Sequence, residues 1–144
     1  QEGVLYLETA ALSQSNTSRG IALSAANSPA NRVVIFYSAS SNIIQGRVQA
    51  STSTTIAING TIPIGSGLIT DFNKIAFKYK SGDLAIWING EERATSSGAF
   101  TFNAALSELA LDQGNGSIHF EGLVKTLAVF KEALSDAELA ALTS

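Results

Sequence analysis

Side chains that could carry out catalysis are few in this sequence, and their spacing does not suit hydrolysis. The single histidine, His119, has no partner motif, and the absence of cysteine argues against thiol chemistry and a zinc site. Glu108 and Asp112 are the one candidate pair of carboxylates for cleaving a glycosidic bond. In a strand they would lie about 13 Å apart, whereas hydrolysis needs about 5 to 9.5 Å. The sequence therefore predicts a protein without enzymatic activity.

Calcium is the metal that the sequence leaves open. The run Asp112-Gln113-Gly114-Asn115-Gly116-Ser117 offers Asp112 and Asn115 as weak candidate ligands, because carboxylate, amide and backbone oxygens bind calcium. The same residues are those that an ordinary turn requires. A plain turn is the favoured interpretation, and no cofactor is expected.

Trp87, the only tryptophan, is the best candidate for stacking on the apolar face of a sugar ring. Leu84, Ile86 and Ile88 alternate with Ala85 and Trp87, which places Trp87 on the sheet face opposite the main core. One interpretation is an exposed platform. The other is that the closing helix or a loop covers Trp87 and makes it part of a satellite core.

A second polar strip could supply hydrogen bonds to sugar hydroxyls. Gln45, Arg47 and Gln49 alternate with apolar or small residues in one predicted strand, which gives a face of amide, guanidinium and amide. If this strand and that of Trp87 share an open face, the two groups form one ligand site, to which Tyr37 and Lys78 could add. The alternative is that these are ordinary solvated strand residues.

Alternation with a period of two runs through most of the chain and is interrupted at short intervals by Gly, Asn and Ser. Asn59-Gly60 and Asn89-Gly90 each suit a two-residue type I′ turn. Strands are expected at Gly3 to Leu7, Gly20 to Ser24, Arg32 to Ser38, Ile43 to Ala50, Thr54 to Ile58, Thr61 to Ile64, Lys74 to Lys80, Leu84 to Asn89, Glu91 to Thr95, Ala99 to Phe102, Glu108 to Asp112, Ser117 to Glu121 and Leu123 to Phe130.

One short helix is expected at the end of the chain. Ser135 and Glu138 have the spacing of a capping box, and Leu139 and Leu142 supply an apolar side. The sequence thus predicts an all-β fold, a two-sheet antiparallel jelly-roll sandwich with a short C-terminal helix. The 144 residues suit a single domain. Because the sequence starts at Gln1 without an initiator Met or a leader, we expect one module of a longer protein.

Composition excludes two classes of partner. Hydrophobic residues make up 45% and charged residues 15% of the chain, which is typical of a folded core. The net charge of -3 gives no basic field for nucleic acid. No apolar run approaches 18 residues, so membrane insertion is not expected.

Two segments resemble a known family. Asp71 to Gly90, a Lys-rich strand followed by Ala-Ile-Trp-Ile-Asn-Gly, resembles the central meander of laminin-G-like domains of the concanavalin A-like lectin superfamily. Gly122 to Leu142, with Phe-Lys-Glu-Ala-Leu-Ser-Asp-Ala-Glu, is similar to the last strand and closing helix of that superfamily. Within that superfamily, the sequence looks most like modules of tail and fibre proteins of marine bacteriophages. Such modules are taken to bind surface glycans or to build the fibre.

The resemblance and the polar residues together lead to two rival expectations. The first is weak binding of a cell-surface glycan through Trp87 with Gln45 and Arg47, made useful by several copies on one particle. The second is a structural building block of a phage tail fibre or capsid, without a glycan ligand, whose strands contact neighbouring copies. Both imply an extracellular or virion-surface location.

Overall fold

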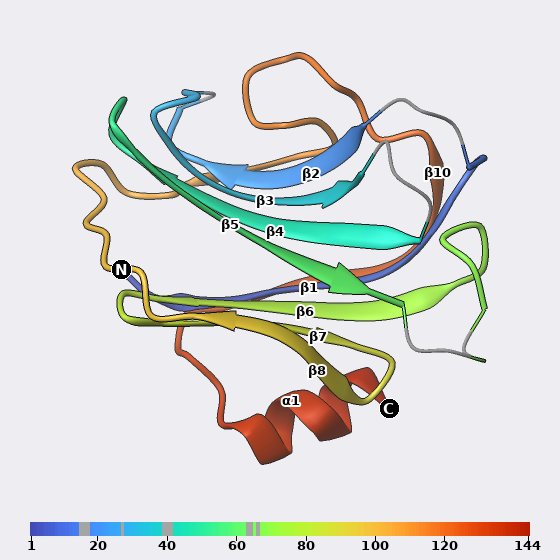
Figure 1. The fold of residues 1–144 in the computed structure, drawn as a ribbon. Coiled ribbons are helices and arrows are strands. Elements are labelled where there is room, and N and C mark those ends of the chain that lie inside the picture. The colour runs from blue at the N-terminus through green and yellow to red at the C-terminus, as the bar shows by residue number, and fades with distance from the viewer. Residues whose placement is uncertain (15–17, 27, 39–41, 63–64, 66) are drawn as a thin grey trace.

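Two antiparallel sheets stack face to face in the computed structural model, which describes residues 1–14, 18–26, 28–38, 42–62, 65 and 67–144. Figure 1 shows sheet B lying above sheet A. Sheet A has the strand order β10-β1-β6-β7-β8, and sheet B has the order β5-β4-β3-β2-β9. The strands of sheet A are β1 (Gly3–Ala11), β6 (Asn73–Lys80), β7 (Asp83–Ile88), β8 (Glu91–Ser96) and β10 (Gly122–Phe130). Those of sheet B are β2 (Arg19–Ser24), β3 (Asn31–Tyr37), β4 (Ile43–Ala50), β5 (Thr54–Thr61) and β9 (Glu108–Ala110).

The core fills the space between the sheets and follows from the period of two. Every second residue of the central strands points inward, and together these side chains form one buried apolar cluster. Its members include Leu5, Leu7, Ile21, Val33, Ile35, Ile44, Val48, Ile75, Phe77, Leu84, Ile86 and Ile88. The predicted jelly-roll sandwich is confirmed.

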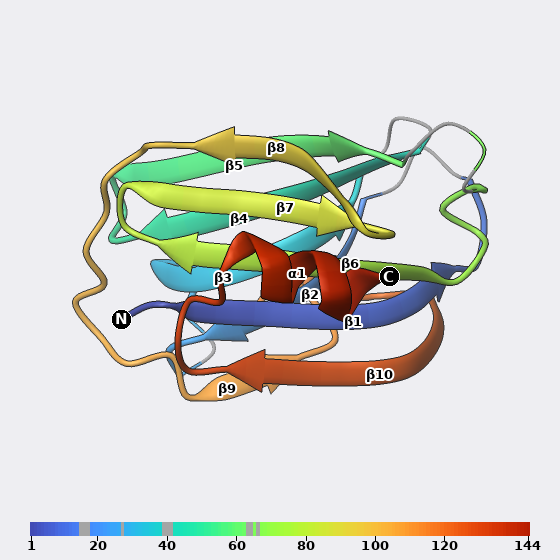
Figure 2. The ribbon, with the colours of Figure 1, turned by 90° about the horizontal axis from the view of Figure 1, so that it is seen from below.

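The outer face of sheet A is covered by the one helix of the described residues, α1 (Asp136–Thr143), which Figure 2 shows lying across the middle of the sheet. Its capping box is present as predicted: the Ser135 hydroxyl accepts from the backbone N–H of Glu138, whose carboxylate accepts from the N–H of Ser135. Leu139 is fully buried against the sheet. No helix in the described part of the chain is long and apolar enough to span a membrane.

The outer face of sheet B carries no such helix among the described residues. Instead the loop at residues 111–121 folds back over β2, and Figure 1 shows it arching above that strand. The N–H of Gly20 donates to the carbonyl of Ile118 at 3.3 Å, and Gly114 lies against Ala22 and Ser24. The rest of this face stays open.

One of the two expected Asn-Gly turns is present and the other is not. Asn89 and Gly90 have φ values of 51° and 86° and connect β7 to β8. Asn59-Gly60 lies inside β5, so the predicted turn there is wrong. A Cβ on Gly60 would lie 3.0 Å from side chains of Ile86 and Ile88, so this glycine serves close packing between the sheets. The chain reverses earlier, at Ser51 with φ 63°.

Three other expected strands differ from the structure. Residues 99–102 and 117–121 are not strands, and the strand expected from Glu108 to Asp112 ends at Ala110. Phe100 and Phe102 instead pack edge to face, with ring centroids 5.1 Å apart. Side-chain-capped turns and the positive φ of nearby glycines interrupt extended structure after Ala110. Of the strand expected at Thr61 to Ile64, residues 63 and 64 lie outside the described residues.

Candidate functional site

Trp87 lies on the outer face of sheet A, as expected, but it is not an exposed platform. Only 9% of its surface is accessible, because α1 covers it and it packs with Tyr6 and Leu139. Its indole N–H is buried and has no hydrogen-bond partner among the described residues. The satellite-core interpretation is therefore the correct one. Since Gln45 and Arg47 belong to the opposite sheet, the idea that Trp87 shares a face with them is wrong.

Tyr37 and Lys78 do not share a face with Gln45 and Arg47 either. Tyr37 points into the core, where its hydroxyl lies 2.7 Å from Thr9 Oγ1 and donates to the Thr9 carbonyl at 3.0 Å. Burial raises the pKa of Tyr37 to about 12. Lys78 lies on the outer face of sheet A, where its amine pairs with Asp83 at 2.9 Å and Asp136 at 3.5 Å. Burial lowers the pKa of Lys78, but the two carboxylates more than offset this, so the pKa is raised.

Gln45 and Arg47 do lie together, in a small groove on the outer face of sheet B. The guanidinium carbon of Arg47 is 4.8 Å from the ring centroid of Phe36, and Nη2 donates to Gln45 Oε1 at 2.7 Å. Gln45 Nε2 in turn donates to Asn59 Oδ1 at 2.8 Å. We call the cavity beside them, of about 170 Å³, the sheet B groove; it is lined by Ser18, Phe36, Ser38, Gln45, Arg47, Gln113 and Ile118.

The floor of the groove depends on a glycine. Gly20 of β2 pairs with Phe36 of β3, and a Cβ there would lie 3.1 Å from the Phe36 ring. The ring can therefore lie low over β2, with Ala22 and Val34 in a small buried cluster. Arg47 then extends across the ring from β4.

Gln49 supports a second arginine next to the groove rather than lining it. Arg32 is buried, with Nη1 donating to the Gln113 carbonyl at 2.6 Å and Nη2 to Gln49 Oε1 at 3.2 Å. Burial and the charge of Arg47 lower the pKa of Arg32, while Asp112 acts in the opposite direction. Burial likewise lowers the pKa of Arg47. The groove therefore lies in a region of positive charge.

Sequence reasoning missed the residues that complete the groove. Phe36 could have been found, because Arg32, Val34 and Phe36 alternate with core residues of β3 and so share the face of Gln45 and Arg47. Ser18, Ser38, Gln113 and Ile118 could not, since they come from loops whose path no sequence pattern fixes.

The candidate calcium ligands take part in turns. Asp112 Oδ1 accepts from the N–H of Gly114, and Asn115 Oδ1 accepts from the N–H and hydroxyl of Ser117. Among the described residues there is no cluster of three or more His, Cys, Asp or Glu side chains that could hold a metal ion. The turn interpretation describes what these oxygens do.

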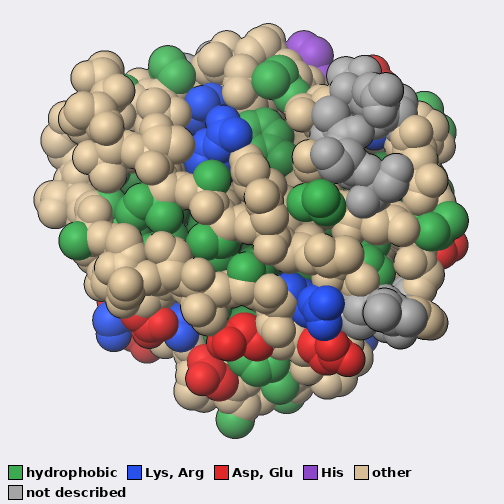
Figure 3. Space-filling model, in the orientation of Figure 1, with side chains coloured by type: hydrophobic (Ala, Val, Ile, Leu, Met, Phe, Trp, Pro, Cys, Tyr) green, Lys and Arg blue, Asp and Glu red, His purple; other side chains and the backbone are tan. Residues whose placement is uncertain are grey.

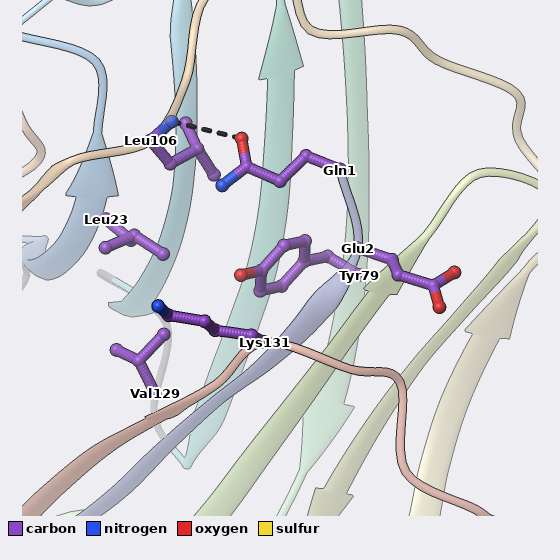
Figure 4. Close-up of a pocket in the computed structure, with 7 residues that line it drawn as sticks. All are labelled: Gln1, Glu2, Leu23, Tyr79, Leu106, Val129 and Lys131. Carbon is purple, nitrogen blue, oxygen red and sulfur yellow. Dashed lines mark hydrogen bonds between the residues drawn. The ribbon is translucent and has the colours of Figure 1, made fainter.

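A larger cavity, of about 370 Å³, opens between the sheets near the start of β1 (Figure 4). Leu23, Leu106 and Val129 supply apolar walls around the ring of Tyr79. The side chain of Gln1 accepts from the N–H of Leu106 at 3.1 Å, drawn as a dashed line. Mostly apolar walls suit a sugar less well than the groove, which has amide, hydroxyl and guanidinium groups.

Acidic side chains gather elsewhere on the molecule. On the side seen in Figure 3, most visible Asp and Glu residues lie in the lower half, at the level of β8 and α1. Glu91 pairs there with Arg93 at 2.7 Å. Glu108 and His119, considered above for catalysis, are exposed, and Asp112 lies in the turn beyond the end of β9.

The fold and the open outer face of one sheet define a lectin-like sandwich, and comparison with known proteins agrees. Residues 10–140 match the laminin-G family model of the concanavalin A-like lectin/glucanases superfamily, so the chain belongs to this superfamily. No curated protein matches the chain.

Three solved structures share the fold. The CBM40 domain of the Ruminococcus gnavus IT-sialidase, bound to α2,3-sialyllactose, has a TM-score of 0.76 and 16% identity, covering 100% of this chain and 83% of that one. Domain 4 of the extracellular arabinanase AbnA of Geobacillus stearothermophilus, in complex with arabinotriose, has a TM-score of 0.71 and 15% identity. The match covers 99% of this chain and 66% of that one. The leech intramolecular trans-sialidase has a TM-score of 0.74 and 17% identity, and the match covers 99% of this chain and 23% of that one.

Proposed function

We propose that this domain is a non-catalytic carbohydrate-binding module and that its ligand lies in the sheet B groove. The observation that carries the proposal is the open groove itself. It places the flat guanidinium of Arg47, the amides of Gln45 and Gln113 and the hydroxyls of Ser18 and Ser38 around one small cavity. Several hydrogen-bonding groups around one small concave site are what orients a sugar ring.

The structural relatives support this proposal by what they bind. The CBM40 domain is seen with sialyllactose and the arabinanase domain with arabinotriose. Sequence identity to both is low, so the support concerns the class of ligand and not a particular sugar.

Absence of catalysis is part of the proposal. Glu108 lies in β9 and Asp112 in the loop beyond it, and the groove is lined by neither of them nor by His119. A groove without a lining carboxylate offers no general acid for glycoside cleavage. Release of reducing sugar from a panel of polysaccharides, at a rate that Glu108→Ala or His119→Ala abolishes, would contradict it.

The setting we propose is a virion or cell-surface adhesion protein outside the cell, of which residues 1–144 form one module. The ground for this setting is the sequence resemblance to phage tail and fibre modules, and the leech enzyme, of which the match covers 23%, supports only the expectation of one module in a longer protein. A single sugar held by a few hydrogen bonds in this groove has about millimolar to micromolar affinity, so several copies must act together.

A glycan array probed with multimerised domain tests the binding function. We expect retention of specific glycans, lost in Gln45→Ala. Thr55→Ala is the matched control, because Thr55 is exposed on the same face of sheet B but does not line the groove. Absence of any retained glycan, or equal loss in both variants, would show that the groove is not a glycan site.

A second candidate function, a structural building block of a fibre or capsid, is favoured by one feature. β10 is an edge strand of nine residues that, among the described strands, pairs with β1 alone, and Leu123 is 62% exposed. Val124 and Val129 are 41% and 40% exposed, and a long apolar edge strand is suited to pairing with another copy. Light scattering should then show a dimer or larger assembly that the double variant Leu123→Lys, Val129→Lys disperses. A monomer at every concentration would count against this role.

A further inference from the structure

Two arginines on the outer face of sheet B lie close together and lack, within the described ranges, the carboxylate partner that most of the other basic residues have. Among the described residues, no carboxylate forms an ion pair with Arg32 or Arg47. Five other basic side chains do have such a partner: Arg19, Lys78, Lys80, Arg93 and Lys125. The chain has an excess of acidic residues, so the exception is not caused by a shortage of carboxylates.

The two guanidiniums are held by neutral acceptors. Arg32 donates to a backbone carbonyl and the Gln49 amide, and Arg47 donates to the Gln45 amide. The Nε of each is buried with no hydrogen-bond partner in the described part of the chain. Nη1 of Arg47 has no hydrogen bond to the described residues either. Keeping two cations close together and partly out of water is unfavourable unless an anion joins them.

We propose that the ligand of the sheet B groove carries an anionic group, a carboxylate or a sulfate ester on a sugar, which pairs with Arg47. This inference rests on the proposed glycan-binding function and specifies its ligand class. The planar fork of a guanidinium matches two oxygens of a carboxylate or sulfate. Arg32 contributes a second positive charge from the neighbouring strand β3, held in place by Gln49 and the 111–121 loop.

The dimensions of the groove indicate which part of a glycan it accepts. About 170 Å³ is less than the roughly 300 to 1,000 Å³ of pockets that enclose drug-sized ligands. The groove therefore takes a single charged sugar unit at the end of a chain or branch, whose hydroxyls can bond to Ser18, Ser38 and the Gln113 side chain. The rest of the glycan stays in solvent.

Isothermal titration calorimetry with matched pairs of oligosaccharides tests this ligand class. The pairs are sialyllactose and lactose, glucuronic-acid-terminated and glucose-terminated chains, and sulfated and unsulfated galactan. We expect about tenfold or tighter binding of an acidic member over its neutral match, the size of one charge-assisted hydrogen-bond pair. The carboxylate and sulfate arms identify which anion is taken. We also expect affinity for the acidic member to fall as salt rises.

Arg47→Gln should remove the preference, lowering affinity for the acidic member about tenfold and for the neutral member less than twofold. Arg93→Gln is the matched control, because it makes the same charge change at a residue outside the groove. Equal affinity for acidic and neutral members, or affinity independent of salt in the unaltered protein, would overturn the anionic ligand while leaving glycan binding intact. Failure to bind any glycan would overturn the proposed function and this inference together.

Discussion

The two outer faces of the sandwich are built from similar alternating strands, but they differ in whether their buried basic residues have carboxylate partners. On sheet A, Lys78 is buried beside two carboxylates, and α1 covers the neighbouring apolar residues. On sheet B, the buried Arg32 and the partly buried Arg47 donate to neutral acceptors beside an open groove. A basic residue whose counter-charge comes from the fold serves stability, whereas one left without a counter-charge is available to a ligand.

The pKa directions express the same contrast. The pKa of Lys78 is raised, so its surroundings favour the charged amine over the same amine in water. The pKa of Arg47 is lowered, so its surroundings disfavour the charged guanidinium. Substitutions on the two faces should consequently differ in what they change.

The largest effect is expected for Trp87→Ala, which empties the space beneath α1. We predict a loss of about 3 to 5 kcal/mol in the free energy of unfolding, measured with denaturant. Trp87→Phe should retain most of the stability, because the indole N–H forms no hydrogen bond with the described part of the chain. Glycan capture by folded Trp87→Phe should equal that of the unaltered protein. Loss of capture in this variant would mean that sheet A holds the ligand.

Alkaline unfolding distinguishes a core Tyr37 from one at the groove. Because burial raises its folded-state pKa to about 12 from an unfolded value near 10, the folded state holds the proton more tightly. The contribution of the protonated Tyr37 to the free energy of unfolding is complete below about pH 10. It is lost as the pH rises through 12, a change of about 2 to 3 kcal/mol. The stability difference from Tyr37→Phe should follow this course. A tyrosine that titrates near pH 10 in the folded protein would not be buried.

Lys78→Met tests the covered face. We expect a loss of about 0.5 to 1 kcal/mol in stability, since the charged amine is favoured where it lies but both carboxylate partners are themselves half exposed and can return to water. Thermal unfolding measures the change, and glycan affinity should not change. A gain in stability would show that desolvation of the amine outweighs its ion pairs.

The smallest change in stability is expected for Arg47→Met on the open face. The loss of the Gln45 hydrogen bond and the contact with Phe36 is offset by relief of a disfavoured charge, so stability should stay within about 0.5 kcal/mol. Affinity for an acidic glycan should nevertheless fall about tenfold, as in Arg47→Gln. A large fall in stability without a change in binding would make Arg47 a structural residue and reverse the comparison.

The sandwich could be predicted because alternation is a local property of the sequence. Ile43 to Ala50 was expected as a strand with those bounds, and the capping box at Ser135 fixed the start of the helix. The turn predicted at Asn59-Gly60 is wrong because an Asn-Gly pair suits a turn by its conformation, but a glycine is also required where a side chain would not fit. Gly60 is needed for the second reason. The requirement for glycine at residue 60 comes from contacts with β7, which the local sequence does not reveal.

The site was predicted only in part for a related reason. The alternation of apolar and polar residues placed Trp87 and Arg47 each on an outer face. It does not indicate whether the two residues lie on the same sheet. The strand order puts β7 and β4 in different sheets, and α1 then covers one of them. The groove also uses loop residues such as Gln113, whose position follows from long-range contacts.

The pairing of Gly20 with Phe36 has a consequence for how such a site could change. A single methyl group added at residue 20 would meet the Phe36 ring at 3.1 Å and lift it, and Arg47 with it, by a few tenths of an ångström. In the proposed complex, the depth at which the sugar lies over Arg47 would therefore be set by β2, a strand that contributes no residue to the lining of the groove. Selectivity between ligands of slightly different height can be tuned from β2 while every contacting side chain is left unaltered.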